Sequence, residues 1–303
     1  MGTTPAPPPA ETLVQLVLRA RHLDELVQNE QDWRALGTIA ARMLFWCGGT
    51  IYACRSEADE MRFALQLVRA PLGTVAHQIA GAYATHLRKT RNLSGSIFKH
   101  YAVVPLREAV FLDELVLWLH RSAPSDAPGI AKTRSITRVW TAESAYLQPH
   151  ALPWINTDRV LTSLSVGAPG AATYRRRKSE PIPSSVLEYF TRRPKHLLPE
   201  HRDRALREPR PNIETIARAV ADYSKVSYED MLADTRKRSV SRARVITTVL
   251  ATRNGATAAA AARLFNRSRS TLIEQVEHYR TKQAGIFVEA ESSLEVFLAE
   301  TRE

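Results

Sequence analysis

The chain has 303 residues, of which 44% are hydrophobic and 24% are charged. A length of this order predicts about two globular domains, each able to bury a core. The two cysteines are too few for a disulfide framework or a zinc module, which favours a reducing cytoplasm. The sequence contains no run of about 18 apolar residues, so we expect no membrane span.

The positive charge is concentrated in two neighbouring regions. The net charge of +11 favours a partner that carries phosphates. It divides into +2 over residues 1–124, +7 over 125–211, +6 over 212–282 and −4 over 283–303. Residues 1–11 are rich in proline and predict a disordered lead-in rather than a signal peptide. We therefore expect the nucleic-acid contacts between residues 125 and 282.

Residues 12–124 are predicted to form an antiparallel sheet with helices on one face. In chain order, the hydrophobic patterns predict a strand over 12–20, a helix over 32–45, strands over 50–54 and 61–68, a helix over 71–89, a strand over 96–106 and a helix over 109–120. Strand-helix-strand-strand-helix-strand is the order of a split βαβ unit. The pattern favours a ferredoxin-like domain, and with a helical C-terminal domain the fold class is α+β.

Four short segments of this region stand in a distinctive order and spacing. They read APL at 70–72, YATHLR at 83–88, GSIFKHY at 95–101 and LDELVLWLHR at 112–121. Together they resemble the REP-associated tyrosine transposases, the single-tyrosine members of the HUH nuclease family. The resemblance implies two histidines on a central strand that hold a divalent metal, and a helical tyrosine that attacks DNA.

The catalytic groups of that family are missing at the matching positions. The strand reads Met61-Arg62-Phe63, and neither a thioether nor a phenyl ring binds a hard cation. The tyrosine position reads Trp118, whose indole has no nucleophilic oxygen. We therefore expect no metal site, no cofactor and no enzyme activity. One alternative is an active metal-dependent transposase that cleaves single-stranded or hairpin DNA with relocated groups, Tyr101 together with His100 or His120.

The middle region, residues 125–211, contains ten prolines and predicts a basic, proline-rich linker with short helices near 144–147 and 183–190. A run of cations there is a candidate secondary DNA contact, with a solvated linker as the equal alternative. The run consists of Arg175, Arg176, Arg177 and Lys178. Trp140 and Trp154 are expected to pack this region onto the sheet.

The C-terminal region, residues 212–282, predicts a helix-turn-helix. We expect helices over 213–223, 227–232, 240–253, 256–265 and 269–282, with a basic loop at 236–238 and a polar turn at 266–268. A helix, a tight turn and a second helix that begins with polar and basic residues is the arrangement that places the second helix in the major groove of DNA.

Five segments extend this match. They read IARAV at 216–220, VSYEDML at 226–232, TRKR at 235–238, AR at 243–244 and ARLFNRSRSTL at 262–272. They resemble the DNA-binding domain of the replication initiator DnaA. The resemblance implies that the basic loop contacts the DNA backbone and neighbouring groove, while residues 267–271 read bases. The implied DNA-binding residues are Arg236, Lys237, Arg238, Arg244, Arg267, Ser268, Arg269, Ser270 and Thr271.

Two features separate the chain from DnaA. The family's Asp-His pair is replaced by Ser268-Arg269, so we expect a different sequence preference. The phosphate-binding motif Gly-x-x-x-x-Gly-Lys-[Ser/Thr] does not occur in the sequence, so no nucleotide cofactor is expected. The acidic tail, residues 283–303, predicts an amphipathic helix that docks on its own domain in preference to a partner.

The sequence as a whole favours a domesticated, catalytically inactive transposase-like regulator that binds specific double-stranded DNA in the bacterial cytoplasm, at the nucleoid. A second alternative is a non-catalytic module that holds hairpin DNA or RNA on its sheet. No membrane partner is expected, and the sequence sets neither the target site nor the oligomeric state.

Overall fold

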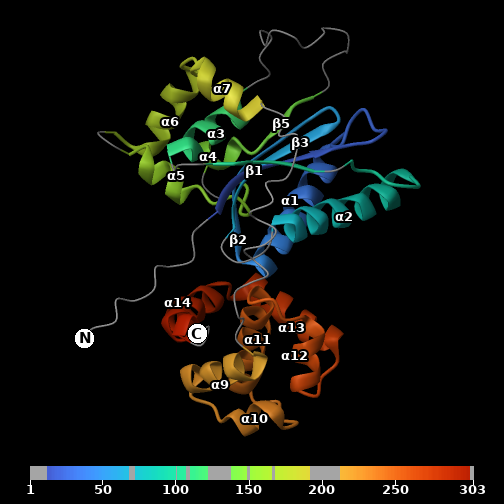
Figure 1. Cartoon of the computed structure of the whole chain (residues 1–303), viewed down its shortest axis with the longest axis vertical. Helices are drawn as coiled ribbons and strands as arrows, with labels where there is room; N and C mark the ends of the chain where they lie inside the picture. The colour runs from blue at the N-terminus through green and yellow to red at the C-terminus, as the bar shows by residue number, and fades with distance from the viewer. Residues whose placement is uncertain are drawn as a thin grey trace. The chain divides into compact units, whose positions relative to one another are not determined.

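The computed structural model describes residues 12–67, 72–99, 101–106, 110–121, 138–148, 151–165, 168–191 and 212–300. These residues form two compact units, one up to residue 191 and one from residue 212 onward (Figure 1). The expected disordered lead-in at 1–11 lies outside the described residues. None of the helices in the described ranges has the length and apolar character needed to cross a membrane.

The first unit is built on a five-stranded antiparallel sheet. Its strands are β1 (Thr12–Arg19), β2 (Gly49–Glu57), β3 (Glu60–Leu67), β4 (Ala102–Pro105) and β5 (Trp140–Thr141), in the spatial order β4-β1-β3-β2-β5. This order inserts β3 between β1 and β2, as in a split βαβ unit. The strand β5, which comes from the region predicted as a linker, extends the sheet beyond β2.

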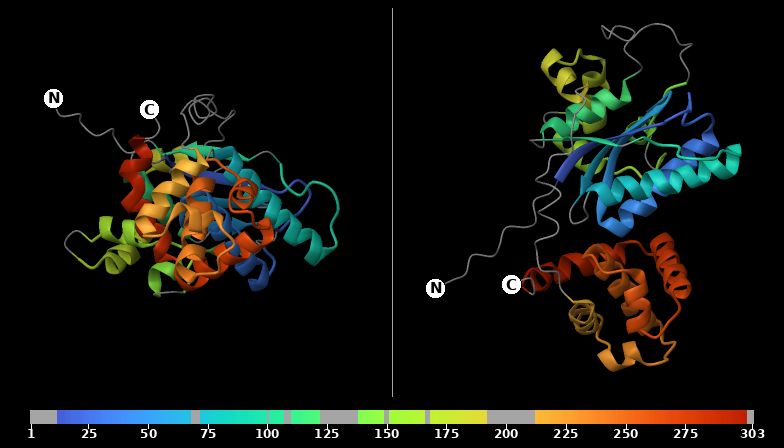
Figure 2. Two further views of the ribbon diagram at one scale, coloured as in Figure 1. Left: turned by 90° about the horizontal axis from the view of Figure 1, so that it is seen from below. Right: turned by 45° about the vertical axis from the view of Figure 1, so that its right-hand side comes forward.

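Helices cover both faces of this sheet (Figures 1 and 2). On one side lie α1 (Glu30–Cys47) and α2 (Leu72–Arg91), and on the other α3 (Val110–His120), α4 (Ser144–Leu147), α5 (Asp158–Ser163), α6 (Gly170–Ser179) and α7 (Ser184–Thr191). The prediction of helices on one face was therefore wrong. Its physical reason is visible in β1, where Leu16 and Val17 point to opposite faces and both are buried.

A buried carboxylate joins α1 to α2. Asp32 Oδ2 accepts from Arg91 Nη2 at 2.6 Å and from the Gln28 amide at 3.1 Å, and its Oδ1 lies 3.2 Å from His86 Nε2. Burial by itself raises the pKa of Asp32, but these hydrogen bonds outweigh it and hold the pKa below its usual value. The carboxylate is therefore ionised and fixes the relative position of the two helices.

Residues 138–191 are part of the folded first unit, so their prediction as a linker was wrong. Trp140 and Trp154 pack against Trp33 of α1, with ring centroids 6.1 and 5.7 Å apart. Gly37 makes room for Trp154, because a Cβ there would lie 2.3 Å from the indole. The short helices expected near 144–147 and 183–190 are present as α4 and α7. Prolines delimit further short helices, as Pro169 does at the N-cap of α6. Residues 125–137 and 192–211 lie outside the described part of the chain.

His120, at the end of α3, is a core residue of this unit. Its Nδ1 lies 2.9 Å from the hydroxyl of Tyr174, and its ring meets the edge of Tyr146 at 5.2 Å. Burial lowers the pKa of His120 to about 3, and the charges of Lys178 and Arg55 act in the same direction. The imidazole is therefore neutral in the folded protein at all ordinary pH values.

This histidine should make the first unit sensitive to acid. Its folded pKa lies below the unfolded value of about 6.5, so its contribution to stability is complete above that pH and is lost as the pH falls toward 3. We expect a loss of about 2 kcal/mol at pH 5 relative to pH 7.5. Urea unfolding followed by tryptophan fluorescence measures it, and His120→Gln should remove this part of the pH dependence. If the free energy of unfolding depends on pH equally in the wild-type protein and in His120→Gln, the prediction is contradicted.

The second unit consists of helices around a central one. They are α9 (Ile213–Ser224), α10 (Tyr228–Leu232), α11 (Arg238–Arg253), α12 (Ala258–Leu264), α13 (Arg269–Lys282) and α14 (Gly285–Glu300). α11 contacts each of the others and is the most buried. α14 packs on α9 and α11, and Glu291 pairs with Arg253. The predicted docking of the tail on its own domain is thus confirmed for α14.

Candidate nucleic-acid interface

The basic loop between α10 and α11 is held from inside by one arginine. Arg244 of α11 is 4% exposed. Its guanidinium donates to four main-chain carbonyls, those of Met231 at 2.7 Å, Thr235 at 2.9 Å, Asp230 at 3.0 Å and Ala233 at 2.5 Å. Burial lowers the pKa of Arg244 from its usual value, but an arginine stays charged after such a shift. Arg244 therefore shapes the loop.

This geometry corrects the assignment of Arg244 to DNA contact. A guanidinium has five N–H donors, and four hydrogen bonds of this one are made inside the protein. Nothing in the sequence separates Arg244 from the exposed cations beside it, because only the path of the loop places carbonyls around its side chain. It is a positioning residue for the basic loop.

The three cations predicted for the loop are exposed, although the last of them is already the first residue of α11. Arg236, Lys237 and Arg238 all face solvent. Lys237 Nζ lies 4.0 Å from a carboxylate oxygen of Asp230, which is a weak contact for a solvent-exposed pair. Within residues 212–294, no ion pair is formed by Arg236 or Arg238. The loop therefore presents positive charge that its own unit does not neutralise.

α12, a turn and α13 form the helix-turn-helix. Asn266 takes a left-handed conformation, with φ of 48°, and reverses the chain after Phe265, which is 1% exposed. Ser268 is the N-cap of α13, and its Oγ accepts from the Thr271 amide at 3.0 Å. Arg269 and Ser270 stand exposed in the first turn, at the positive end of the helix dipole.

The turn is tied to the basic loop. Arg267 forms an ion pair with Asp234 and lies 3.5 Å from the Thr235 carbonyl. The hydroxyl oxygens of Ser268 and Thr271 lie 2.7 Å apart in the cap. These two residues therefore stabilise the start of α13, in addition to any contact that they make with DNA. The structure brings all nine predicted residues into one region, where Arg244 is buried, Arg267 is half-buried and the others are exposed. Sequence reasoning missed Asp234, which carries no motif signal of its own.

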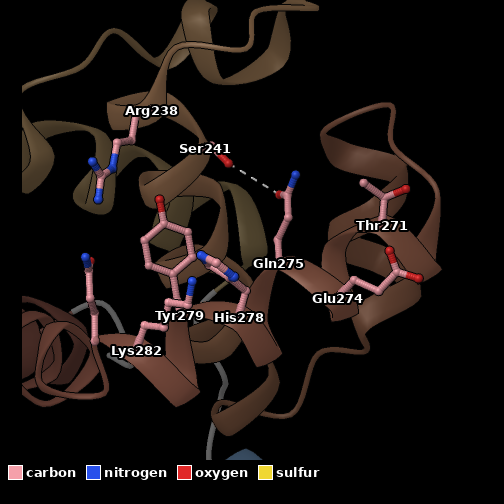
Figure 3. A pocket seen from close by; sticks show the side chains of 9 residues that line it. Arg238, Ser241, Thr271, Glu274, Gln275, His278, Tyr279 and Lys282 are labelled. Carbon is pink, nitrogen blue, oxygen red and sulfur yellow. Dashed lines mark hydrogen bonds between the residues drawn. The ribbon is translucent and has the colours of Figure 1, made fainter.

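A groove runs between α11 and α13 (Figure 3). It encloses about 540 Å³ and is lined by Arg238, Ser241, Thr271, Glu274, Gln275, His278, Tyr279, Lys282 and Gln283. A neighbouring hollow of about 380 Å³ shares Ser241, Thr271 and Gln275 and continues to Thr235 and Arg236. Ser241 Oγ donates to Gln275 Oε1 at 3.5 Å. One continuous depression thus leads from the basic loop along α13.

In the first unit, the positions matched to transposase catalytic residues do not meet. Met61 and Phe63 are fully buried and share one face of β3, whereas Arg62 points to the opposite face. There the Arg62 guanidinium lies over the Trp118 ring, 4.9 Å from its centroid. Glu60, Arg62 and Ala64 share the face that Trp118 covers, and none is a histidine. Among the described residues, no group of three or more potential metal ligands lies together.

The groups of the alternative enzyme have separate environments. The Tyr101 ring packs on His77 of α2, with centroids 5.4 Å apart, whereas His120 is buried against Tyr146 and Tyr174. His100 lies outside the described residues. The structure does not bring Tyr101 and His120 to a common partner.

Two of the four cations on α6 form ion pairs inside their own unit. Arg177 pairs with Glu114, and Lys178 pairs with Glu143. Arg175 and Arg176 remain exposed, the latter 3.8 Å from Glu180. Two of the four predicted secondary DNA contacts are therefore placed to hold α6 onto the domain.

Comparison with known proteins identifies the second unit. A family described as the bacterial DnaA protein helix-turn-helix matches residues 213–278, which run from α9 into α13. Neither the curated proteins nor the solved structures compared with the chain give a match. Residues 213–278 are a DnaA-type helix-turn-helix domain, and a domain of this type implies double-stranded DNA as its partner. The first unit has no match, and its resemblance to tyrosine transposases rests on the sequence segments.

Proposed function

We propose that this protein is a sequence-specific double-stranded DNA-binding regulator that acts at the bacterial nucleoid. The observation that carries the proposal is that two exposed elements lie side by side. Arg269 and Ser270 open α13, and the basic loop stands beside them, held by the hydrogen bonds of Arg244 and contacted by Arg267 through Asp234. Side chains at a helix start can reach base edges in the major groove, while loop cations meet phosphates.

Arg269 is the residue that sets the sequence preference in this proposal. An arginine donates two hydrogen bonds to O6 and N7 of guanine, the commonest specific contact in the major groove. DnaA has a histidine at the matching position, which cannot form the same pair. The preferred site should therefore contain a guanine that an origin-type box does not require at that position.

Two substitutions separate base reading from backbone contact. Arg269→Ala should reduce the free energy of binding to the preferred duplex by about 1–3 kcal/mol and relax the preference at one base pair. Lys237→Ala should weaken binding to all sequences alike. Selection from a random duplex pool identifies the site, and titrations of matched and mismatched duplexes give the free energies. Selection without any enriched sequence, or affinity that is insensitive to salt, would contradict the proposed function.

For the first unit we propose a transposase-like body that no longer catalyses strand cleavage. The strand order β4-β1-β3-β2 supports the relationship. The residues on the face of β3 that Trp118 covers, Glu60, Arg62 and Ala64, support the loss of activity, because none of them matches the histidines that such a centre needs. The alternative of a hairpin bound on the sheet has no support here, since helices cover both faces.

A further inference from the structure

A polar stripe runs along α13 from its first turn to its last, and beyond Thr271 it consists of residues to which base reading is not assigned. Thr271, Gln275, His278 and Lys282 follow one another at helical spacing, and all four line the groove against α11. The opposite side of the helix is apolar, with Leu272 and Val276 fully buried. The stripe therefore faces the groove along the length of the helix, as Figure 3 shows for the labelled side chains.

The groove is lined almost entirely by donors and cations. Arg238 at the start of α11 and Lys282 at the end of α13 supply the cations, and His278 adds a ring nitrogen (Figure 3). Glu274 is the single carboxylate among the nine lining residues, and it is exposed. Within residues 212–294, neither Arg238 nor Lys282 forms an ion pair. Such a lining suits an extended anion that follows the helix.

Dimensions indicate which anion this is. From Arg269 to Lys282, α13 spans about 20 Å at 1.5 Å per residue, whereas the major groove is about 12 Å wide. When the first turn contacts base edges, the last turns of the helix lie at or beyond the rim of the groove. The rim is the sugar-phosphate backbone, so Lys282 and His278 reach the level of the phosphates.

We propose that the α11–α13 groove binds the phosphodiester backbone that flanks the bases read by Arg269, with His278 and Lys282 as its contacts. This inference rests on the proposed function and extends it. The basic loop and the start of α13 contact the core site, and the groove lengthens the contact by part of a helical turn. It adds affinity without adding sequence preference, because phosphates are the same at every base pair.

The test uses the full chain and two duplexes. One duplex ends at the selected site, and the other extends ten base pairs beyond it on each side. Lys282→Gln should weaken binding to the long duplex roughly five-fold at 0.15 M salt and lower the slope of log K against log salt by about 0.9. The ratio between matched and mismatched sites should not change. His278→Ala should also weaken binding to the long duplex, by a smaller factor.

Lys225→Gln is the matched control. Lys225 is exposed at the C-cap of α9 and is not part of the groove, so its loss removes the same charge from the same unit. It should leave the salt slope unchanged. The wild-type protein should also prefer the long duplex, and Lys282→Gln should lose most of that preference.

The outcomes distinguish the two levels of the proposal. If wild type selects a site but Lys282→Gln keeps the wild-type slope and preference for the long duplex, the groove is not a backbone site and only this inference falls. Equal losses for Lys282→Gln and Lys225→Gln would point to general charge and would also overturn it. If wild type selects no sequence, the proposed function falls and this inference falls with it. Circular dichroism of each variant verifies folding.

Discussion

Arg244→Lys is expected to abolish specific DNA binding and to lower the free energy of unfolding of the second unit by about 3 kcal/mol. Of the four carbonyls that Arg244 bridges, two lie in the last turn of α10 and two in the loop that follows it, and each hydrogen bond to a charged donor contributes about 1.5–3 kcal/mol. An ammonium is a point charge that cannot serve four carbonyls in a fork arrangement. The loop should lose its shape, and Arg236 and Lys237 should lose their alignment with α13.

The two units can be followed separately in the same experiment. All five tryptophans lie at positions 33, 46, 118, 140 and 154, so tryptophan fluorescence reports the first unit alone. Urea unfolding measured by circular dichroism includes the helices of the second unit. Arg244→Lys should shift the circular dichroism transition toward lower urea while the fluorescence transition stays in place.

Arg263→Lys, in α12 of the same unit, is the control, because the Arg263 side chain is exposed. It should leave both transitions within about 0.5 kcal/mol of wild type, as for surface substitutions in general. An Arg244→Lys protein that keeps its stability and binds the selected duplex with wild-type affinity would show that the side chain does not hold the loop. Arg244 would then be reconsidered as a DNA contact.

The helix-turn-helix could be predicted in detail because its boundaries are encoded locally. The last helix was expected over 269–282, which are the bounds of α13, and the one before the turn over 256–265, close to α12 at 258–264. Ser227 and Ser268 accept hydrogen bonds from amides three residues on, at 2.9 and 3.0 Å. Such caps depend on neighbours in sequence, which are visible without a fold.

What could not be predicted depends on contacts between distant segments. The sequence predicts that Trp140 and Trp154 pack their region onto the sheet, but not that both meet Trp33 of α1, more than a hundred residues away. β5 is only two residues long, too short for any periodic pattern. The role of each basic residue could not be predicted either, because it depends on the partner that the fold places beside the cation. Arg177 pairs with Glu114 and Arg244 with carbonyls, whereas Arg269 stays exposed, although all three look alike in the sequence.

Tyr174→Ala should destabilise the first unit by about 3–5 kcal/mol, the range for removing a buried aromatic side chain. Tyr174 lies in α6, in the region that composition predicts as a linker, yet it is fully buried. Its ring stacks on Tyr146 at 4.9 Å, and its hydroxyl is the partner of His120 Nδ1 at 2.9 Å. The substitution leaves a cavity and a buried imidazole without its hydrogen bond. Urea unfolding followed by tryptophan fluorescence measures the change.

Arg175→Ala gives the comparison from the adjacent position of the same helix. Its side chain is exposed, so its removal should change the stability by no more than about 0.5 kcal/mol. A segment that is a solvated linker would tolerate both substitutions equally, because neither side chain would then contribute to a core. A large difference between the two variants therefore requires that α6 unfolds together with the sheet. Equal midpoints would mean that residues 138–191 dock on the sheet without sharing its cooperative unfolding.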